Sequence, residues 1–298
     1  MLEAVERKID QYVLDFNDKD IAYIVSKIPA GKRLRARLMI EIAGNRLNVI
    51  KSAAIVEMIH AASLLHDDVI DNANTRRGVA SINATFGNKS AIMIGDILYS
   101  KAFYELVDID REIAKIISNA VVQLSIGERK DVAMSNNFNI NKSEYLTMIY
   151  QKTAALIEAA SEVAAILAKK DREIYKKYGR NLGIAFQMID DILDITSNQK
   201  TLGKPVLNDF VEGKTTLPYI YLYEALDDRA KYRLKSLHKK NLSDEEQEWI
   251  LDCFDKYNII SRAKDEAFTL VNEAINLMKK ANEKSLEAIA LKMVDRSF

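Results

Sequence analysis

Turn-forming residues are scarce in this chain, and this scarcity limits the folds that it can adopt. Its 298 residues include 10 glycines and 3 prolines, whereas average usage would give roughly twice as many glycines and about five times as many prolines. Sheet-rich folds need frequent turns, which these two residues form. We therefore expect long helices joined by few loops.

Apolar residues recur with helical spacing along most of the sequence. Between residues 53 and 65 they follow one another at intervals of three and four positions, at Ile55, Ile59, Ala62 and Leu65. Further along, Ser243 followed by Glu246 is a capping-box pattern that predicts a helix start. Because no linker-like Gly, Ser or Pro tract interrupts the chain, we expect one all-α domain over residues 1–298.

Charge and cysteine content exclude several classes of protein. Lys and Arg number 43 and Asp and Glu number 43, so the formal net charge is zero, which argues against binding of nucleic acid or anionic membrane by bulk charge. The single cysteine, Cys253, excludes an internal disulfide and a CxxC metal site. With no signal-peptide core and no apolar run long enough to span a membrane, we expect a cytoplasmic protein without a transmembrane segment.

An Asp-Asp-x-x-Asp pattern occurs twice, at Asp67, Asp68 and Asp71 and again at Asp190, Asp191 and Asp194. In a helix, the first and last aspartates of each copy share a face, so their like charges repel. Apolar neighbours raise that cost, and a positive partner is therefore expected. Mg²⁺ is often held by one or two carboxylates together with substrate phosphates. One copy would be a weak signal, but two copies with equal spacing predict Mg²⁺ binding.

Basic residues form short clusters around these motifs: Lys32-Arg33-Leu34-Arg35, Arg76-Arg77, Lys152 beside Thr153, and Lys204 with Lys214. Arginine offers phosphate a bidentate fork and lysine a point charge. Each cluster alone is typical of a solvated surface, and none has P-loop spacing. Together with the acidic motifs, they predict two phosphorylated substrates, one bound through metal and one bound directly.

The histidines do not form a recognisable catalytic group. His60 and His66 are six residues apart and do not share a helix face well. His238 lies in a Lys-rich segment and is expected at the surface. No Ser–His–Asp or Cys–His pairing is evident.

The order and spacing of these motifs resemble the all-trans polyprenyl diphosphate synthases (isoprenyl synthases). The similarity extends from about residue 31 to about residue 218, and the stretch 60–95 is most like long-chain bacterial members such as octaprenyl diphosphate synthase. It rests on the basic and acidic segments above together with Gly78, Gly95-Asp96, Gln187 and Gly213-Lys214-Thr215. The resemblance implies a homodimeric helical bundle around a deep central cavity.

The resemblance also implies a chain-elongation reaction. An allylic diphosphate ionises with the help of Mg²⁺, and the double bond of isopentenyl diphosphate attacks the resulting cation. Loss of a proton then regenerates an allylic diphosphate that is one isoprene unit longer. The expected product is a long-chain, octaprenyl-like polyprenyl diphosphate for isoprenoid or quinone side chains.

Carried over residue by residue, the resemblance assigns most of the polar motif residues. Mg²⁺ would be held by Asp67, Asp71 and Asp190, with support from Asp68, Asp191 and Asp194. The allylic diphosphate would contact Arg76, Lys152, Lys204 and Lys214. Isopentenyl diphosphate would bind Lys32, Arg35, His60 and Arg77, and the reacting carbons would lie beside Thr153 and Gln187.

Three positions bear on how this chain differs within the family. The usual Gly-Gly-Lys-Arg-x-Arg-Pro motif ends here in Ala36, a change of backbone shape rather than of charge. Ala62 and Ser63 lie five and four residues before Asp67. Short-chain members tend to carry aromatic residues there, so two small residues predict a tunnel that stays open to long products.

Other functions remain open at this point. A short-chain synthase would make farnesyl or geranylgeranyl diphosphate from the same motifs. A non-catalytic subunit of a heteromeric synthase typically lacks one or both acidic motifs. A terpene cyclase needs no second diphosphate site, so the set Lys32, Arg35 and Arg77 argues against it. A purely structural helical bundle would not explain why the aspartate motif occurs twice.

Overall fold

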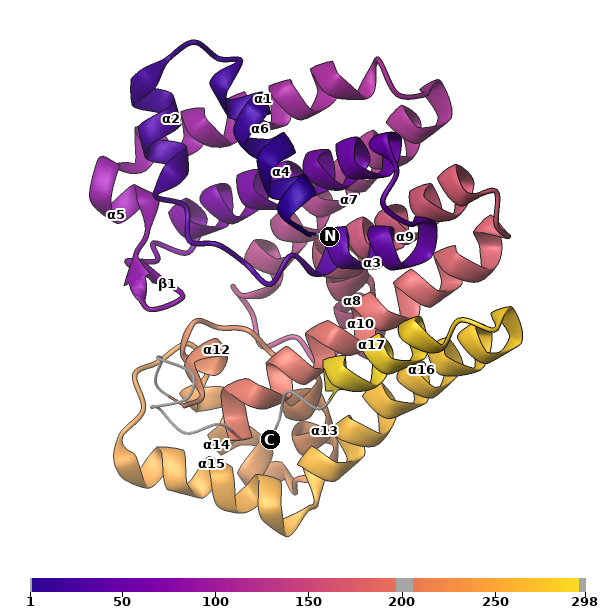
Figure 1. The fold of residues 1–298 in the computed structure, drawn as a ribbon. Helices are drawn as coiled ribbons and strands as arrows, with labels where there is room; N and C mark the ends of the chain where they lie inside the picture. Colours follow the sequence, from indigo (N-terminus) through magenta and orange to yellow (C-terminus); the bar gives the residue numbers. More distant parts are fainter. Residues whose placement is uncertain (1, 197–205, 295–298) are drawn as a thin grey trace. The chain divides into compact units, whose positions relative to one another are not determined.

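Helices joined by short connections make up the chain (Figure 1). The computed structural model describes residues 2–196 and 206–294. Its residues group into two compact units, Met1–Val122 with Leu156–Gly179 and Gln123–Ala155 with Arg180–Phe298. Helices α7 (Arg111–Met134) and α10 (Arg172–Thr196) contribute residues to both units. The all-α class predicted from the sequence is confirmed, and the single domain over residues 1–298 stays a prediction.

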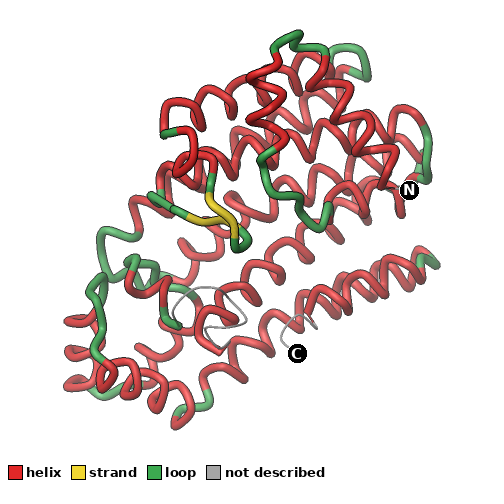
Figure 2. Tube along the Cα trace, turned by 60° about the vertical axis from the view of Figure 1, so that its left-hand side comes forward, coloured by secondary structure: helices red, strands yellow, loops and turns green. Residues whose placement is uncertain are grey.

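The first unit contains the N-terminal helices and a small hairpin. Its elements are α1 (Leu2–Leu14), α2 (Lys19–Ser26), α3 (Leu34–Ala43), α4 (Leu47–Ile70), β1 (Thr75–Arg76), β2 (Val79–Ala80), α5 (Ile82–Phe86), α6 (Asn88–Leu106) and nearly all of α9 (Ala155–Ala168). The two short strands pair antiparallel, and they are the only strands among the described residues (Figure 2).

Helix α4 is the core of this unit, packed against α1, α3 and α6. The four apolar residues predicted to share a helix face, Ile55, Ile59, Ala62 and Leu65, are all buried. By length and composition, α4 is the one described helix that could cross a membrane, but 61% of that apolar window is buried inside the structure. A buried core helix passes the same test.

The second unit is also helical. Its elements are α8 (Lys142–Ile149), a single π-helical turn η1 (Tyr150–Ala154), α12 (Asn208–Val211), α13 (Leu217–Ala225), α14 (Asp228–Leu237), α15 (Asp244–Lys256), α16 (Ile259–Ala281) and α17 (Lys284–Val294). The capping box predicted at Ser243 and Glu246 is present at the start of α15. Helix α13 packs against α8, α15 and α16.

Glycines on two neighbouring helices allow their backbones to approach the π-helical turn closely. A Cβ on Gly127 of α7 would lie 2.3 Å from the backbone nitrogen of Lys152, and one on Gly183 of α10 would lie 2.6 Å from the Cα of Ala154. Only glycine permits such close backbone approach. Single π turns inside helical segments are frequent at functional sites, and this one carries Lys152 and Thr153.

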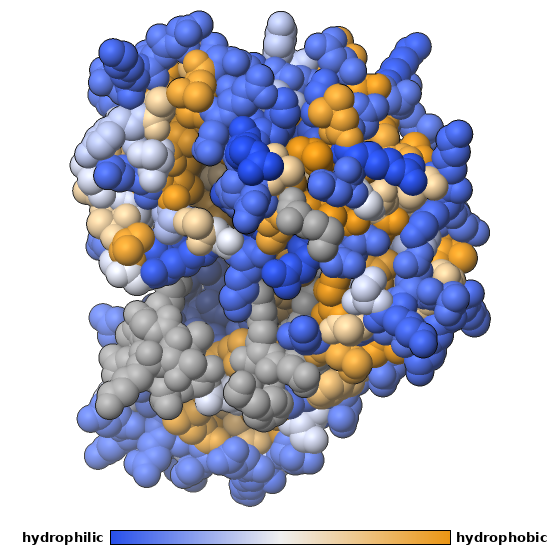
Figure 3. Space-filling view, viewed as in Figure 1, coloured by the Kyte–Doolittle hydropathy of each residue, from blue (hydrophilic) through white to orange (hydrophobic). Residues whose placement is uncertain are grey.

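Polar and charged residues cover most of the face shown in Figure 3, with apolar residues scattered among them. Such a mixture is ordinary for a protein surface, much of which is contributed by apolar atoms.

Candidate active site

The first acidic motif occupies the C-terminal end of α4. Asp68 is buried and forms an ion pair with Arg76, whose Nη2 lies 2.6 Å and whose Nε lies 2.8 Å from the carboxylate oxygen Oδ1. The Asn83 amide donates to the carbonyl of Asp68 at 3.2 Å and to that of Ala73 at 3.0 Å. Asp68 therefore fixes the hairpin that carries Arg76 against the end of the helix.

The other two aspartates of this motif are more accessible. Asp67 is partly exposed in the last turn of α4, and Asp71, the C-cap residue, is exposed. Their spacing places them one turn apart on the same side of the helix end. The motif thus divides into one carboxylate that holds the protein together and two that solvent reaches.

A cluster of cationic groups lies in the same unit. Arg35 is buried, Lys32 is exposed, and Arg77 donates from Nη1 to the carbonyl of Pro29 at 2.7 Å. A Cβ on Gly31 would lie 2.9 Å from Nη1 and Nη2 of Arg77, so glycine leaves the room that this guanidinium occupies. Arg77 has the unusual backbone angle φ = 53°, and such conformations concentrate at functional sites.

His60 lies among these cations. Burial lowers the pKa of His60 well below its ordinary value, and the positive charges of Arg35 and Arg77 lower it further. Burial likewise lowers the pKa of Arg35. The imidazole is therefore neutral at neutral pH and sits in a positive electrostatic field, which suits an anionic ligand.

A buried carboxylate, Glu57 of α4, balances this cluster. Its Oε1 accepts a hydrogen bond from the backbone N–H of Ala36 at 3.0 Å, and its Oε2 lies 3.6 Å from Nη1 of Arg33. Arg33 also pairs with Glu6 at 2.7 Å. At the position where the family usually has proline, which has no N–H, Ala36 thus provides a donor that is paired inside the protein.

The second acidic motif lies on α10, and its Asp191 joins a chain of side-chain hydrogen bonds. Tyr145 of α8 donates to Oδ2 of Asp191 at 2.7 Å, and the Gln187 amide donates to Oδ1 at 2.8 Å. The Thr153 hydroxyl donates to Oε1 of Gln187 at 2.6 Å. Burial raises the pKa of Asp191 well above its ordinary value, and the nearby Asp209 carboxylate raises it further.

The remaining aspartates of this motif differ in exposure. Asp194 is buried, and its side-chain Oδ2 accepts the backbone N–H of Asp209 at 3.1 Å while its carbonyl accepts that of Leu207 at 3.1 Å. These bonds fix the start of α12. Asp190 is partly exposed. As in the first motif, some carboxylates are used to hold the fold and others are reached by solvent.

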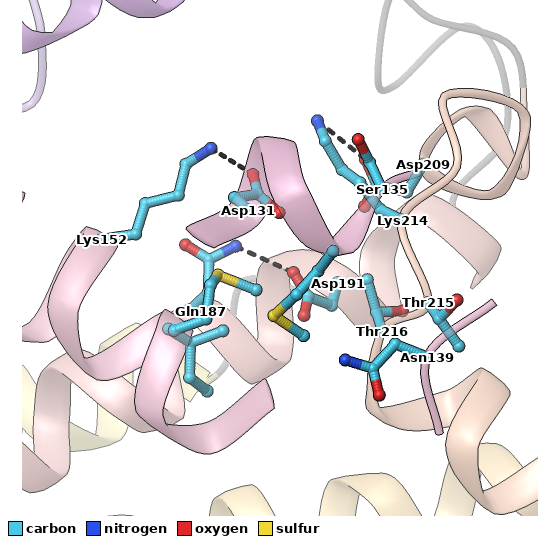
Figure 4. Close-up of a pocket in the computed structure, with 13 residues that line it drawn as sticks. Asp131, Ser135, Asn139, Lys152, Gln187, Asp191, Asp209, Lys214, Thr215 and Thr216 are labelled. Carbon is cyan, nitrogen blue, oxygen red and sulfur yellow. Dashed lines mark hydrogen bonds and ion pairs between the residues drawn. The ribbon is translucent and has the colours of Figure 1, made fainter. Parts of the chain in front are cut away.

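A pocket of the second unit brings several predicted residues together. It encloses 160 Å³ and is lined by Lys152, Gln187, Asp191 and Lys214, together with Asp131 and Asp209, which were not predicted (Figure 4). The Lys152 ammonium lies 2.5 Å from Asp131 and 2.8 Å from Glu128. The Lys214 ammonium lies 2.7 Å from Glu212 and 4.0 Å from Asp209. The ammonium groups of both pocket lysines therefore form ion pairs with carboxylates.

Two further predictions concern Lys204 and His238. Lys204 lies outside the described residues. The prediction that His238 is a surface residue is wrong, because it is half-buried, with Nε2 2.7 Å from the carbonyl oxygen of Gly213 and its ring against Phe138 and Phe210. It supports the loop that precedes Lys214, a contact between segments 25 residues apart that local sequence does not reveal.

The two predicted chain-length residues lie on α4. Ala62 is fully buried, whereas Ser63 is partly buried and donates to the carbonyl of His60 at 2.9 Å. Their role in product length stays a prediction.

The carboxylates suit a hard divalent cation. Asp67 and Asp71 at the end of α4 and Asp190 on α10 carry carboxylate oxygens, and each of these side chains is partly or fully exposed. Among residues 2–196 and 206–294, no three His, Cys, Asp or Glu side chains are grouped as a metal site. Mg²⁺ keeps several waters and is commonly bound through one or two carboxylates and substrate phosphates, so the donor type fits this ion.

Sequence reasoning missed several polar residues of the site: Glu57, Glu128, Asp131 and Tyr145. One signal was available for Glu57, since a lone carboxylate within an apolar stretch of a helix must be paired. Asp131 and Tyr145 carry no such local signal. Their importance follows from partners that lie 21 and 46 residues away.

Known proteins with similar sequences and folds point to one family. Residues 18–254 match the family model described as Polyprenyl synthetase. The chain is 38% identical over 257 residues to a short chain isoprenyl diphosphate synthase of Methanocaldococcus jannaschii, covering 80% of this chain and 78% of that one. It is 32% identical to an octaprenyl diphosphate synthase of Haemophilus influenzae, covering 100% and 98% of the two chains.

A solved structure is similar over nearly the whole length. The octaprenyl pyrophosphate synthase of Helicobacter pylori matches with a TM-score of 0.94 and 43% identity, covering 99% of this chain and 98% of that one. Similar relatives thus include proteins named for short and for long products. The chain is a prenyl diphosphate synthase and belongs to the polyprenyl synthetase family.

Proposed function

We propose that this enzyme is a Mg²⁺-dependent, all-trans synthase that condenses isopentenyl diphosphate head-to-tail with an allylic diphosphate to a long-chain, octaprenyl-like product. The observation that carries the proposal is the pocket in which Lys152 and Lys214 lie beside Gln187 and Asp191. The two lysines can bind a departing diphosphate, and the hydrogen-bonded side chains of Asp191, Gln187 and Thr153 can lie beside the reacting carbons.

The cationic side chains bind and orient the allylic diphosphate. Lys152, Lys214 and Arg76 supply positive charge that stabilises the leaving diphosphate as the carbon–oxygen bond breaks. In the described structure these side chains already pair with carboxylates, among them Asp131, Glu212 and Asp68. They are therefore held in place before any substrate arrives, which reduces the entropy lost on binding.

The aspartates that solvent reaches are assigned to the cation. Asp67, Asp71 and Asp190 hold Mg²⁺ on the allylic diphosphate, while Asp68, Asp191 and Asp194 remain bonded to protein donors. When bound, the ion neutralises charge that develops on the departing group. The different exposure of the two sets supports this division.

The first unit's cationic cluster binds isopentenyl diphosphate directly. Arg35 and Arg77 provide fixed positive charge, the exposed Lys32 adds an ammonium group, and the neutral His60 donates a hydrogen bond without adding charge. The negative charge of buried Glu57 offsets part of the repulsion between the positive charges of the arginines.

We also propose a homodimer that works in the cytoplasm. One side of α6 and its C-cap exposes four apolar residues, Ile92, Met93, Tyr104 and the C-cap residue Val107. Clusters of exposed apolar side chains mark interaction surfaces, and a second copy of the same chain satisfies such a face by two-fold symmetry.

One assay tests the reaction and the product length together. Purified protein receives isopentenyl diphosphate and farnesyl diphosphate with Mg²⁺, and products are measured by mass spectrometry. We expect a series of prenyl diphosphates that ends near the octaprenyl product and disappears when EDTA removes the metal. Ala62→Phe and Ser63→Phe, which place a ring where the tunnel is predicted, should each shorten the final product.

The outcomes separate the alternatives. Products that end at geranylgeranyl diphosphate would support the short-chain synthase. Consumption of the allylic diphosphate without any need for isopentenyl diphosphate would support a cyclase. No turnover by the pure chain, with activity restored by a second protein, would support a non-catalytic subunit.

A further inference from the structure

The hydroxyl of Tyr145 joins two helices of the second unit. Tyr145 lies on α8 and is fully buried. Its hydroxyl donates to Oδ2 of Asp191 on α10 at 2.7 Å. Helix α13 packs against α8 in the same unit. One buried phenol therefore joins α8 to α10.

The hydrogen bonds beyond Asp191 run toward the pocket. Its Oδ1 accepts from the amide nitrogen of Gln187, whose Oε1 accepts from the hydroxyl of Thr153. An amide can face either way unless its neighbours decide its orientation. Here Asp191 receives the nitrogen end and Thr153 the oxygen end, so the orientation of Gln187 depends on Asp191 staying in place.

Tyr145 itself does not line this pocket, unlike Gln187 and Asp191. Its effect on the chemistry must therefore pass through the residues that it holds. Removing one donor from a buried, doubly bonded carboxylate leaves an oxygen without its partner, and such a group reorients to recover a bond.

We propose that Tyr145 is a positioning residue for chain elongation, which fixes Asp191 and, through it, the side chains of Gln187 and Thr153 beside the reacting carbons. The inference rests on the function proposed above. It adds a residue that is uncharged at neutral pH and lies outside the pocket to a site that is recognised mainly by its charged residues.

Tyr145→Phe tests this with the least disturbance of packing. The variant should elongate with a kcat about tenfold lower, the size expected from one hydrogen bond to a charged group. KM for both substrates should stay within about twofold, because the groups assigned to the diphosphates keep their contacts. A purely structural role would lower the melting temperature without this separation of kcat from KM.

Tyr219→Phe is the matched control. Tyr219 lies on α13 of the same unit and is fully buried, but its hydroxyl has no hydrogen-bond partner within the part of the chain that the structure describes. Loss of that hydroxyl should leave kcat unchanged. Equal losses of kcat in the two variants would overturn the inference.

A double-mutant cycle with Gln187→Leu tests the path of the effect. If Tyr145 acts through Asp191 and Gln187, the Tyr145→Phe change should cost much less in the Gln187→Leu background than in the wild type. Additive losses would overturn the inference.

The wild-type assay separates the proposed function from the role of Tyr145. If the wild type does not elongate, the proposed function and this inference fall together. If the wild type elongates and Tyr145→Phe keeps its kcat, only the inference is overturned.

Discussion

At the scale of single residues, His60 links the candidate substrate site to stability. Burial, and then the charges of Arg35 and Arg77, lower the pKa of His60 well below the value of about 6.5 that it has in an unfolded chain. Below that pH the unfolded chain binds a proton that the folded chain does not. The contribution of His60 to the free energy of unfolding is therefore fully present above about pH 6.5 and is lost as the pH falls below that value.

His60→Gln should remove this dependence. Unfolding by urea, measured from pH 7.5 to pH 5.5, should show the free energy of unfolding of the wild type falling faster than that of the variant, by up to about 1.4 kcal/mol per pH unit below pH 6.5. The two curves should run parallel at higher pH. Parallel curves throughout would show that the folded and unfolded chains protonate His60 alike.

At the scale of elements, the π-helical turn depends on how closely α7 approaches it. A Cβ on Gly127 would lie 2.3 Å from the nitrogen and 2.7 Å from the Cα of Lys152. These are backbone atoms, so no flexible side chain can move aside. The turn must shift as a whole, and the Lys152 ammonium would shift with it, away from Asp131 and Glu128.

Gly127→Ala should therefore destabilise the protein by about 1–3 kcal/mol and weaken binding of the allylic diphosphate. Thermal unfolding and KM for that substrate measure the two effects. Val132→Ala, at an exposed position of the same helix, is the control and should change stability by less than about 0.5 kcal/mol. Full stability and an unchanged KM in Gly127→Ala would contradict the importance of this contact.

At the scale of the whole molecule, the exposed face of α6 is expected to join two copies of the chain. Met93, Tyr104 and Val107 are 57%, 69% and 79% exposed and recur along one side of the helix. A symmetric dimer would cover this face twice at once, so a single charged substitution acts on both copies.

Tyr104→Lys should shift the protein from dimer to monomer, and light scattering after size exclusion measures the mass. Tyr232→Lys is the control, because Tyr232 is an equally exposed tyrosine, 79% exposed, on a different helix, α14. A wild-type protein of monomer mass would contradict the dimer, and a Tyr104→Lys protein of dimer mass would place the interface elsewhere.

Much of the fold and the family could be predicted from the sequence. Few glycines and prolines, regular apolar spacing in α4, and the Ser243 capping box are local signals, and local signals decide where helices form. The motif order, with two aspartate triplets and their basic neighbours, pointed to the polyprenyl synthetase family because it depends on residue type and spacing alone.

Only the tertiary structure decided what each charged residue contacts. Asp68 and Asp71 belong to one motif, yet Asp68 is buried against Arg76 while Asp71 is exposed. The roles of Glu57 and Tyr145, and the half-buried place of His238, likewise depend on partners from distant segments. Apolar periodicity predicts which face of a helix is buried. It does not predict which side chains of other segments contact that face, because distant segments come together only when the chain folds.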